Sequence, residues 1–375
     1  MNTNRISMTL ISPIFLSMIF FSPQKVKSQT VTNYFFYVGT YTNDESEGIY
    51  KYWLKEDGSI KKIGLVAKSN NPSYLAKSLD NAFLIAVNEI GNNAGGGKLE
   101  SYAIEADSLK RISQKSSGGG YPCFIGINKK GYVLTANYED GTVTLSKLTR
   151  TGALSEPLDV LQHVGSGTTP RQEGPHAHSV WFDGNDNIIS IDLGTNDLWF
   201  SRIETNTNKI TPSNPQTLPM PIGAGPRHMT LHPNNTWAYV INELSSTITM
   251  LSKSNTENYK IGQSISTLPN NYDGTSTCAD IHISSDGKFV YASNRGHDSI
   301  AIYSVNSTNG ELDLVGHELT RGKTPRNFAL SPDDCYLLVA NQNTNTIVSF
   351  KRDETSGLLT FVDEIDAPTP VCILF

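Results

Sequence analysis

The sequence predicts an all-β fold, a seven-bladed β-propeller of four-stranded blades. Three observations predict it: a repeat of 45 to 53 residues, short segments in which apolar residues alternate, and turn residues between those segments. The 375 residues suffice for one large domain, and 30 glycines with 18 prolines suit many tight turns. A helical solenoid is excluded because Phe289 and Tyr291 alternate with Val290 and Ala292, which is the period of a strand.

Each copy of the repeat begins near a proline and continues as an apolar strand, a polar turn and a second strand. The anchor residues are Pro72, Pro122, Pro175, Pro226, Cys278, Pro325 and Pro370. Six copies are full, and the seventh is cut off after its first strand, 370–375. Segments 35–42 (FFYVGTYT) and 48–54 (GIYKYWL) look like the missing second and third strands. We therefore expect the two ends of the chain to pair and close the ring, which leaves no open sheet edge.

The first 28 residues are expected to be a cleavable secretory signal outside the fold. Arg5 precedes an apolar stretch of 14 residues, 8–21, and Val26-Lys27-Ser28 provides a small residue before Gln29. A membrane anchor is the alternative, but a span needs about 20 apolar residues. We expect residues 29–375 to form the propeller of an exported monomer, periplasmic or secreted, without a stable membrane anchor.

Charge and cysteine usage exclude several function classes. The net charge of -6 gives no basic footprint, so nucleic-acid binding is not expected. The glycine-rich run 91–97 does not lie between a strand and a helix, so it is interpreted as a loop and not as a phosphate cradle. Four cysteines allow three disulfide pairings, but each lies in strand-like sequence, and we expect buried free thiols at Cys123, Cys278, Cys335 and Cys372.

Strand direction predicts where a site should form. In a blade, the start of the first strand and the end of the second lie on one face of the disc, near the central channel. Polar residues there differ between blades, whereas a structural role should recur with the repeat. We therefore predict a small-molecule site at this face. Its candidate residues are Glu89, Asn137, Tyr138, His176, His178, Asp192, Arg227, His228, Glu243, Asn294, Arg295, Arg326 and Gln342.

The residue types in this set suggest acid/base chemistry on a negatively charged group. The guanidinium groups of Arg227 and Arg295 suit a carboxylate, a phosphate or a developing oxyanion, or else they pair structurally with Glu243 or Asp280. Glu243 could act as a general base toward water. His176 and His178, two residues apart on a strand, share a face, and one of them could be an acid/base group. Two histidines alone are a weak metal signal, so we expect no metal.

Two flanking residues are expected to have other roles. His228 follows Arg227 directly, so strand alternation predicts that it points away and is structural. Phe124 adds an apolar group to the funnel of its blade.

Nine motifs run in order along the chain: Val38-Gly39-Thr40-Tyr41-Thr42, Asn71-Pro72-Ser73-Tyr74-Leu75, Ala136-Asn137-Tyr138, Pro175-His176-Ala177-His178, Asp192-Leu193-Gly194, Gly225-Pro226-Arg227-His228, Asn242-Glu243-Leu244, Ser293-Asn294-Arg295-Gly296 and Ala340-Asn341-Gln342. With these motifs the chain resembles the seven-bladed β-propeller lactonases of the 6-phosphogluconolactonase type. The resemblance implies hydrolysis of a sugar δ-lactone without a metal or organic cofactor. A related muconate cyclase activity implies catalytic roles for His178 (or His176), Arg227, Glu243 and Arg295.

The sequence departs from this family at two places. Phe124 stands where the family often has histidine, and the segment 192–197 is one residue longer than the usual motif, which leaves the role of Asp197 open. In addition, 6-phosphogluconolactone is a cytosolic metabolite, whereas this chain is expected to be exported. The substrate could therefore be an unphosphorylated sugar lactone.

The resulting hypothesis is a lactonase in which Glu243 or neutral His178 deprotonates water while Arg227 and Arg295 stabilise the oxyanion. The residues expected to bind substrate are His176, Asn137, Tyr138, Glu89, Asp192, Asn294, Arg326 and Gln342. Two alternatives stay open, a muconate-type cyclase or lyase and a non-catalytic propeller that binds a ligand or a protein.

Overall fold

The computed structural model describes residues 1–3, 33–253 and 258–375, and the unit that carries the fold spans Asn33–Phe375. The predicted secretory signal, residues 1–28, lies outside the described residues apart from its first three. In the described ranges, no helix is long and apolar enough to cross a membrane.

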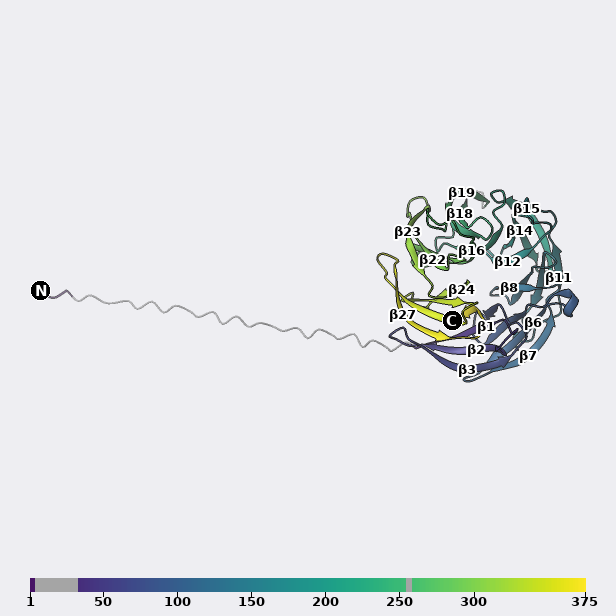
Figure 1. Cartoon of the computed structure of the whole chain (residues 1–375), viewed down its shortest axis with the longest axis horizontal. Helices are drawn as coiled ribbons and strands as arrows, with labels where there is room; N and C mark the ends of the chain where they lie inside the picture. The colour runs from purple at the N-terminus through teal and green to yellow at the C-terminus, as the bar shows by residue number, and fades with distance from the viewer. Residues whose placement is uncertain (4–32, 254–257) are drawn as a thin grey trace. The chain divides into compact units, whose positions relative to one another are not determined.

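Seven four-stranded antiparallel sheets are arranged in a ring, which confirms the predicted β-propeller (Figure 1). The strands of each blade are given innermost first. Blade 1 consists of β28(Pro370–Leu374), β1(Tyr34–Thr40), β2(Gly48–Leu54) and β3(Ile60–Lys68), and blade 2 of β4(Leu75–Lys77), β5(Phe83–Asn88), β6(Lys98–Ile104) and β7(Leu109–Ser116). Blade 3 consists of β8(Pro122–Ile127), β9(Tyr132–Asn137), β10(Thr142–Lys147) and β11(Asp159–Gln162), blade 4 of β12(Ala177–Phe182), β13(Ile188–Asp192), β14(Asp197–Glu204) and β15(Lys209–Pro219), and blade 5 of β16(Pro226–Leu231), β17(Trp237–Asn242), β18(Thr247–Lys253) and β19(Tyr259–Ser266). Blade 6 consists of β20(Thr277–Ile283), β21(Phe289–Arg295), β22(Ser299–Val305) and β23(Leu312–Leu319), and blade 7 of β24(Pro325–Leu330), β25(Tyr336–Asn341), β26(Thr346–Arg352) and β27(Leu359–Asp366).

The ends of the propeller unit close the ring as the sequence predicts. The C-terminal strand β28 is the innermost strand of blade 1 and pairs antiparallel with β1, with Val38 opposite Ile373 and Gly39 opposite Cys372. The backbone before blade 2 passes close to Gly39, where a Cβ would lie 2.3 Å from the carbonyl oxygen of Pro72. A residue with a side chain therefore does not fit at this position. Closure therefore removes the open edges that a row of sheets would expose.

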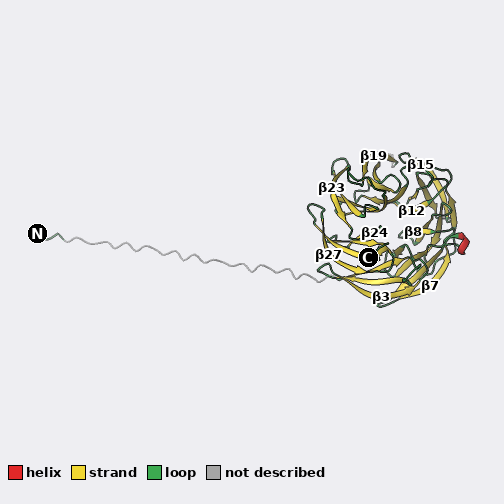
Figure 2. Cartoon of the chain, viewed as in Figure 1, coloured by secondary structure: helices red, strands yellow, loops and turns green. Residues whose placement is uncertain are grey.

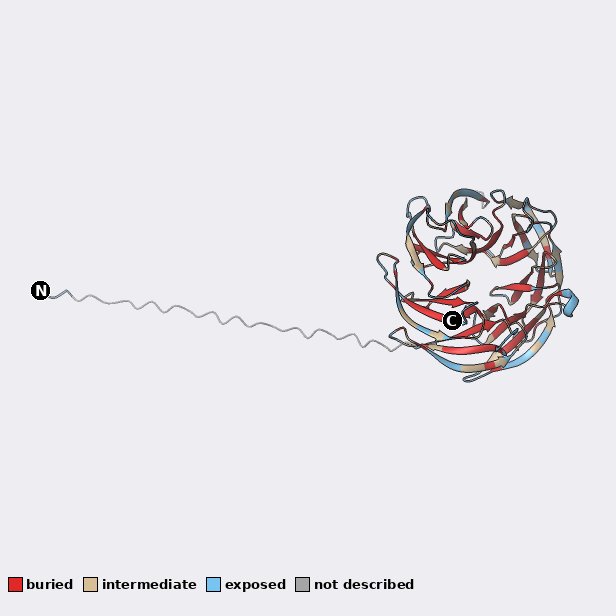
Figure 3. Ribbon diagram, viewed as in Figure 1, coloured by how far each residue is buried: buried red, intermediate tan, exposed pale blue. Residues whose placement is uncertain are grey.

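The core consists of apolar clusters between neighbouring blades. One cluster joins Phe36 and Tyr52 of blade 1 to Leu338 and Ile347 of blade 7, and each of the other blade interfaces of the described chain has its own cluster. The inner strands are buried and the outer strands are largely exposed (Figure 3). Nearly all regular structure is strand, and the short 3-10 helix Asn92–Ala94 lies inside the glycine-rich loop (Figure 2).

The turns opposite the predicted site repeat in sequence and in bonding. In three blades a serine hydroxyl donates to an aspartate two residues later at 2.6 Å: Ser78 to Asp80, Ser284 to Asp286 and Ser331 to Asp333. This recurrence indicates that the polar residues of these turns serve to form tight turns.

Candidate active site

A β-bulge near the start of the inner strand turns one side chain of several blades into the channel. In blade 4, β12 and β13 pair on both sides of His178, which itself has no partner. The same register shift leaves four further residues unpaired: Cys123, Arg227, Arg326 and Val371. A bulge re-aims the side chain of the extra residue, and all five line one channel cavity. We call these five residues the bulge ring.

A second ring lies directly above, at the channel mouth, where the second strand of each blade ends. The backbone N–H of its residues bonds back to the start of the inner strand, as Glu243 does to Gly225 at 2.7 Å and Glu89 to Asn71 at 3.0 Å. This mouth ring consists of Tyr41, Glu89, Tyr138, Leu193, Glu243, Arg295 and Gln342. Five residue types occupy these seven equivalent positions, in agreement with the argument that predicted a site here.

The carboxylate of Glu243 binds three arginines. Its Oε2 is 3.0 Å from Arg227 Nε and 2.9 Å from Arg295 Nη2, and its Oε1 accepts from Arg171 Nη2 at 3.3 Å. Burial opposes ionisation, but Arg295, Arg227 and Arg171 lower the pKa of Glu243 to about 2. A carboxylate with so low a pKa is a weak base at neutral pH. Glu243 is therefore better suited to holding guanidinium groups than to deprotonating water.

Arg227 is 2% exposed, and its guanidinium is held from two sides. Nη1 donates to the carbonyl of Ala279 at 2.5 Å, and Nε faces Glu243. Burial, together with Arg295 and Arg326, lowers the pKa of Arg227 to about 10. The side chain stays charged at neutral pH, so a cation is maintained beside the cavity.

His228 does not point away from Arg227, so this prediction is wrong. Its Nε2 lies 3.3 Å from Arg227 Nη1, and its Nδ1 is 2.9 Å from Asp280. The bulge at Arg227 breaks the alternation on which the prediction depended. Burial and Arg227 lower the pKa of His228 to about 4, so the ring is neutral at neutral pH. Asp280 thus holds two histidines, His228 and His282, and not an arginine.

His178 presents an uncommitted ring nitrogen to the cavity. Nδ1 lies 3.8 Å from Cys123 Sγ, the ring of Tyr138 packs edge-on at 5.6 Å, and Nε2 has no hydrogen-bond partner within the described chain. Burial lowers the pKa of His178 well below 6.5, and Arg227 and other nearby cations lower it further. A neutral imidazole with an open Nε2 can accept a proton from water.

His176 lies beside His178, as their spacing predicted, and both rings contact Tyr138. The ring of His176 stacks on Tyr138 at 4.5 Å, its Nδ1 is 3.0 Å from the carbonyl of Tyr138, and its Nε2 is 3.2 Å from Glu173. His176 therefore packs at the rim of the mouth, and both ring nitrogens already have partners.

Arg326 lies over the ring of Tyr41, with Cζ 5.4 Å from the ring centre. The hydroxyl of Tyr41 donates to both carboxylate oxygens of Glu89 at 2.9 Å, and the hydroxyl of Ser73 donates to the same carboxylate. These donors occupy Glu89 and fix the ring on which Arg326 rests. Within the described chain, the guanidinium of Arg326 itself has no ion pair or hydrogen bond, although it lines the cavity.

Sequence reasoning missed Arg171, which lies in the loop between β11 and β12. Nη2 of Arg171 donates to Tyr138 Oη at 2.9 Å and also to Glu243. Arg171 therefore links the mouth-ring residues of blades 3 and 5, on either side of Leu193 in blade 4. The neighbouring Gln172, fully buried, fixes the loop through bonds to the backbone of Thr168, Thr169 and Leu193. This loop is outside the repeat, so comparison of blades carries no signal for it.

Of the eight residues predicted to bind substrate, Glu89 and Arg326 line the cavity. Tyr138, His176 and Gln342 lie at the mouth without lining it, and the other three are used inside their blades. Asn137 donates to the carbonyl of Ser117 and to the hydroxyls of Thr142 and Thr144, and Asn294 donates to the carbonyl of Thr267. The carboxylate of Asp192 accepts from backbone N–H groups of its own turn and contacts a histidine, His163. Unlike the mouth ring, this position is asparagine in five blades: Asn88, Asn137, Asn242 and Asn341 end the second strands of four, and Asn294 is the last residue but one of the second strand of a fifth.

The channel cavity is small and polar. Its volume of about 10 Å³ is close to that of one water molecule, and it is lined by the bulge ring with Ser73, Tyr74, Glu89, His228 and Asn327. Phe124 lies in the apolar core between blades 3 and 4, with its ring centre 4.3 Å from that of Tyr74 and 4.6 Å from that of Trp181. It is not among the residues that line this cavity, to which its blade contributes Cys123.

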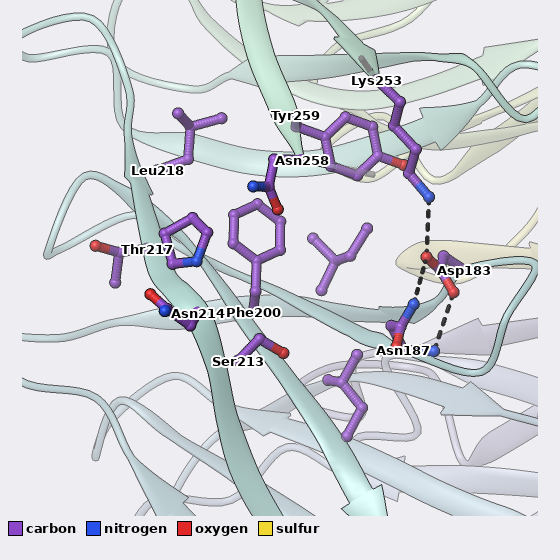
Figure 4. A pocket seen from close by; sticks show the side chains of 13 residues that line it. Asp183, Asn187, Phe200, Ser213, Asn214, Thr217, Leu218, Lys253, Asn258 and Tyr259 are labelled. Carbon is purple, nitrogen blue, oxygen red and sulfur yellow. Dashed lines mark hydrogen bonds and ion pairs between the residues drawn. The ribbon is translucent and has the colours of Figure 1, made fainter. Parts of the chain in front are cut away.

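A wider cleft of about 280 Å³ lies between blades 4 and 5, away from the channel (Figure 4). Phe200, Tyr259 and Leu218 form its apolar part, and Asp183 and Lys253 lie at one side. The carboxylate of Asp183 already accepts from Lys253 at 3.0 Å and from Asn187 at 3.1 Å. The cleft thus lacks a free acid/base pair among its described residues, and we place the chemistry in the channel.

All four cysteines are free thiols, as the sequence predicted, but only Cys123, Cys278 and Cys372 are buried. Cys335 is partly exposed because it lies in the turn before β25 and not in a strand. Burial raises the pKa of Cys278 and of Cys372 to about 12, so these thiols stay protonated. In the described part of the chain, no group of three or more His, Cys, Asp or Glu side chains is arranged to hold a metal ion.

Comparison with known proteins agrees with this fold. The model of a family described as "Lactonase, 7-bladed beta-propeller" matches residues 35–375. A 6-phosphogluconolactonase of Bacillus subtilis is 35% identical over 352 residues, which cover 92% of this chain and 99% of that protein. A 6-phosphogluconolactonase of Formosa agariphila is 34% identical and covers 86% of this chain and 94% of its own length.

A solved structure of a periplasmic gluconolactonase from Pseudomonas aeruginosa superposes with a TM-score of 0.87. It is 30% identical, and the match covers 91% of this chain and 98% of that one. The family model and the relatives extend over nearly the whole propeller, including every blade that contributes to the channel. The chain therefore belongs to the seven-bladed β-propeller lactonase family.

Proposed function

We propose that the protein hydrolyses a sugar δ-lactone in the mouth of the central channel. The observation that carries the proposal is that a neutral, buried histidine with an open Nε2, His178, faces the same water-sized cavity as two arginines, Arg227 and Arg326. Lactone hydrolysis needs a base for water and a cation for the developing oxyanion, and this cavity brings both together.

The proposed reaction begins with water in the cavity and the lactone carbonyl above it. His178 Nε2 takes a proton as the water oxygen attacks the carbonyl carbon, and the π electron pair moves to the carbonyl oxygen. A channel guanidinium stabilises this oxyanion. When the carbonyl re-forms, the bond from carbon to the ring oxygen breaks, and the imidazolium returns its proton to that oxygen. The product is a hydroxy acid, which loses its carboxyl proton to solvent.

Glu243 supports this reaction without acting as the base. Both of its carboxylate oxygens are occupied by arginines, which argues for a role as the anion that holds the cationic side of the mouth, whereas Nε2 of His178 has no hydrogen-bond partner within the described chain. Of the two bases that the sequence left open, we therefore propose His178.

The substrate is proposed to be a sugar lactone of the gluconolactone type. The relatives named above are 6-phosphogluconolactonases and a gluconolactonase. Because the sequence predicts export, we propose an unphosphorylated lactone and an exported, periplasmic or secreted, monomer. Fractionation of cells that express the full chain would test export: mature protein that begins after residue 28 is expected outside the cytoplasm, and full-length protein retained inside would contradict it.

The test of the function is a panel assay with purified residues 29–375. Glucono-δ-lactone, 6-phosphogluconolactone and a γ-lactone are assayed by proton release, corrected for spontaneous hydrolysis. We expect turnover of δ-lactones, with the unphosphorylated compound preferred. Turnover of no lactone, combined with cyclisation of an unsaturated dicarboxylate, would establish the cyclase alternative. Binding without turnover of either class would establish the binding-propeller alternative.

A further inference from the structure

Arg326 differs from the other arginines of the channel in having a guanidinium group without a partner. Arg227, Arg295 and Arg171 all contact Glu243, and Arg227 and Arg295 also donate to the backbone carbonyls of Ala279 and Cys278. No hydrogen bond or ion pair engages the Arg326 guanidinium within the described chain, yet Arg326 lines the water-sized cavity. All of its donors are available to a ligand, whereas Arg295 uses its Nη2 and leaves its buried Nε without a hydrogen bond.

The surroundings of Arg326 hold it in place without using its donors. The guanidinium lies over the face of Tyr41, an attractive contact that leaves the N–H groups free in their own plane. Tyr41 is itself fixed because its hydroxyl donates to both oxygens of Glu89, which also accepts from Ser73. A donor group that is oriented before the substrate arrives is what stabilisation of a transition-state charge requires.

Arg326 and His178 are equivalent residues of different blades. Each is the bulged residue of its inner strand, so both side chains enter the channel at the same level. The two are close enough that the charge of Arg326 contributes to keeping His178 neutral. A carbonyl group between them would have its carbon facing a water bound to His178 and its oxygen facing Arg326.

We propose that Arg326 is the oxyanion-binding catalytic residue, with Tyr41 and Glu89 as the platform that positions it. This inference rests on the proposed lactonase function. It assigns stabilisation of the oxyanion to Arg326, whose guanidinium has no hydrogen bond or ion pair within the described chain, and not to Arg227 and Arg295, which the sequence favoured. Arg227 and Arg295 then serve with Glu243 to set the charge of the mouth.

The test compares Arg326→Ala with Arg321→Ala on the δ-lactone that the wild type hydrolyses fastest. Arg321 is an exposed arginine between β23 and β24, outside the channel. Its Cζ lies 4.1 Å from the ring centre of Phe361. We expect Arg326→Ala to lose about 10²–10³-fold in kcat with little change in KM, the usual cost of one oxyanion donor. Arg321→Ala should keep wild-type kcat, and circular dichroism should show both variants folded.

Chemical rescue separates catalysis from a structural role. Added guanidinium at concentrations below those that unfold the protein should restore part of the kcat of Arg326→Ala, and should not restore Arg321→Ala or the wild type above their own rates. Tyr41→Phe, which loses the bond to Glu89, should lower kcat less than Arg326→Ala does.

Three results would overturn the inference. The first is an Arg326→Ala variant that retains kcat within threefold of wild type. The second is a loss of kcat/KM that lies entirely in KM, as expected of an anchor for a distant substituent. The third is a folded variant that guanidinium does not rescue. Failure of the proposed function itself has a different signature, because the wild type would then hydrolyse no lactone.

Discussion

Replacement of Glu243 by glutamine tests whether this carboxylate is the electrostatic centre of the channel. The variant keeps the shape of the side chain and removes its charge, which leaves Arg227, Arg295 and Arg171 without a counter-ion. The fall of the Glu243 pKa from 4.5 to about 2 corresponds to about 3 kcal/mol of stability at neutral pH. Loss of one partner from a buried ion pair costs a similar amount, about 3–5 kcal/mol.

The pH dependence of this effect has a defined sign. Because folding lowers the pKa of Glu243, its contribution is fully present above the unfolded value of 4.5 and is lost as the pH falls toward about 2. The stability difference between wild type and Glu243→Gln should therefore shrink by about 1.4 kcal/mol between pH 7 and pH 3.5.

Urea unfolding followed by tryptophan fluorescence at both pH values measures these differences. The matched control is Glu156→Gln, an exposed carboxylate that pairs with Lys115 at the surface; it should change stability by less than about 1 kcal/mol. A Glu243→Gln protein within 1 kcal/mol of wild type at pH 7, or a difference that grows on acidification, would refute the electrostatic role.

Individual contacts give three further predictions. His178→Asn should lower kcat by about 10²–10⁴-fold. Because the pKa of His178 is lowered, the acid limb of the wild-type pH profile of kcat/KM should lie well below pH 6.5. An acid limb at or above pH 6.5 would contradict His178 as the base. Asn137→Ala should lower the free energy of unfolding by about 1–3 kcal/mol and leave kcat/KM unchanged within twofold, whereas a selective loss of activity would restore it as a substrate-binding residue. A thiol reagent should find four free thiols in the unfolded protein and in the native protein should react first with Cys335, which is the most accessible of them; fewer than four would reveal a disulfide.

The fold was predictable because its information is repeated. Alternating strands occur in every blade and a proline anchor in all but one, where Cys278 takes its place. The incomplete last copy of the repeat is enough to identify the C-terminal strand as the partner of β1. Much of the mouth ring was predictable for the same reason, since Glu89, Tyr138, Arg295 and Gln342 occupy one position of the repeat and differ in type.

The rest of the site depends on features that break the repeat. A bulge of one residue changes which side chain enters the channel, and alternation alone therefore misplaced His228. Asn137 and Asn294 were misjudged for the opposite reason: their position recurs in other blades, which is the mark of a structural role. Arg171 comes from a loop with no counterpart in other blades, so only the folded chain shows that it reaches Glu243.

The most direct test of the channel as the lactonase site is a crystal structure with a sugar δ-lactam, in which an N–H group replaces the ring oxygen and prevents hydrolysis. The account predicts the lactam in the channel mouth, with its carbonyl oxygen within hydrogen-bonding distance of Arg326 and its carbonyl carbon beside His178 Nε2. A lactam bound in the cleft between blades 4 and 5, or in the channel with its carbonyl turned away from both residues, would contradict it.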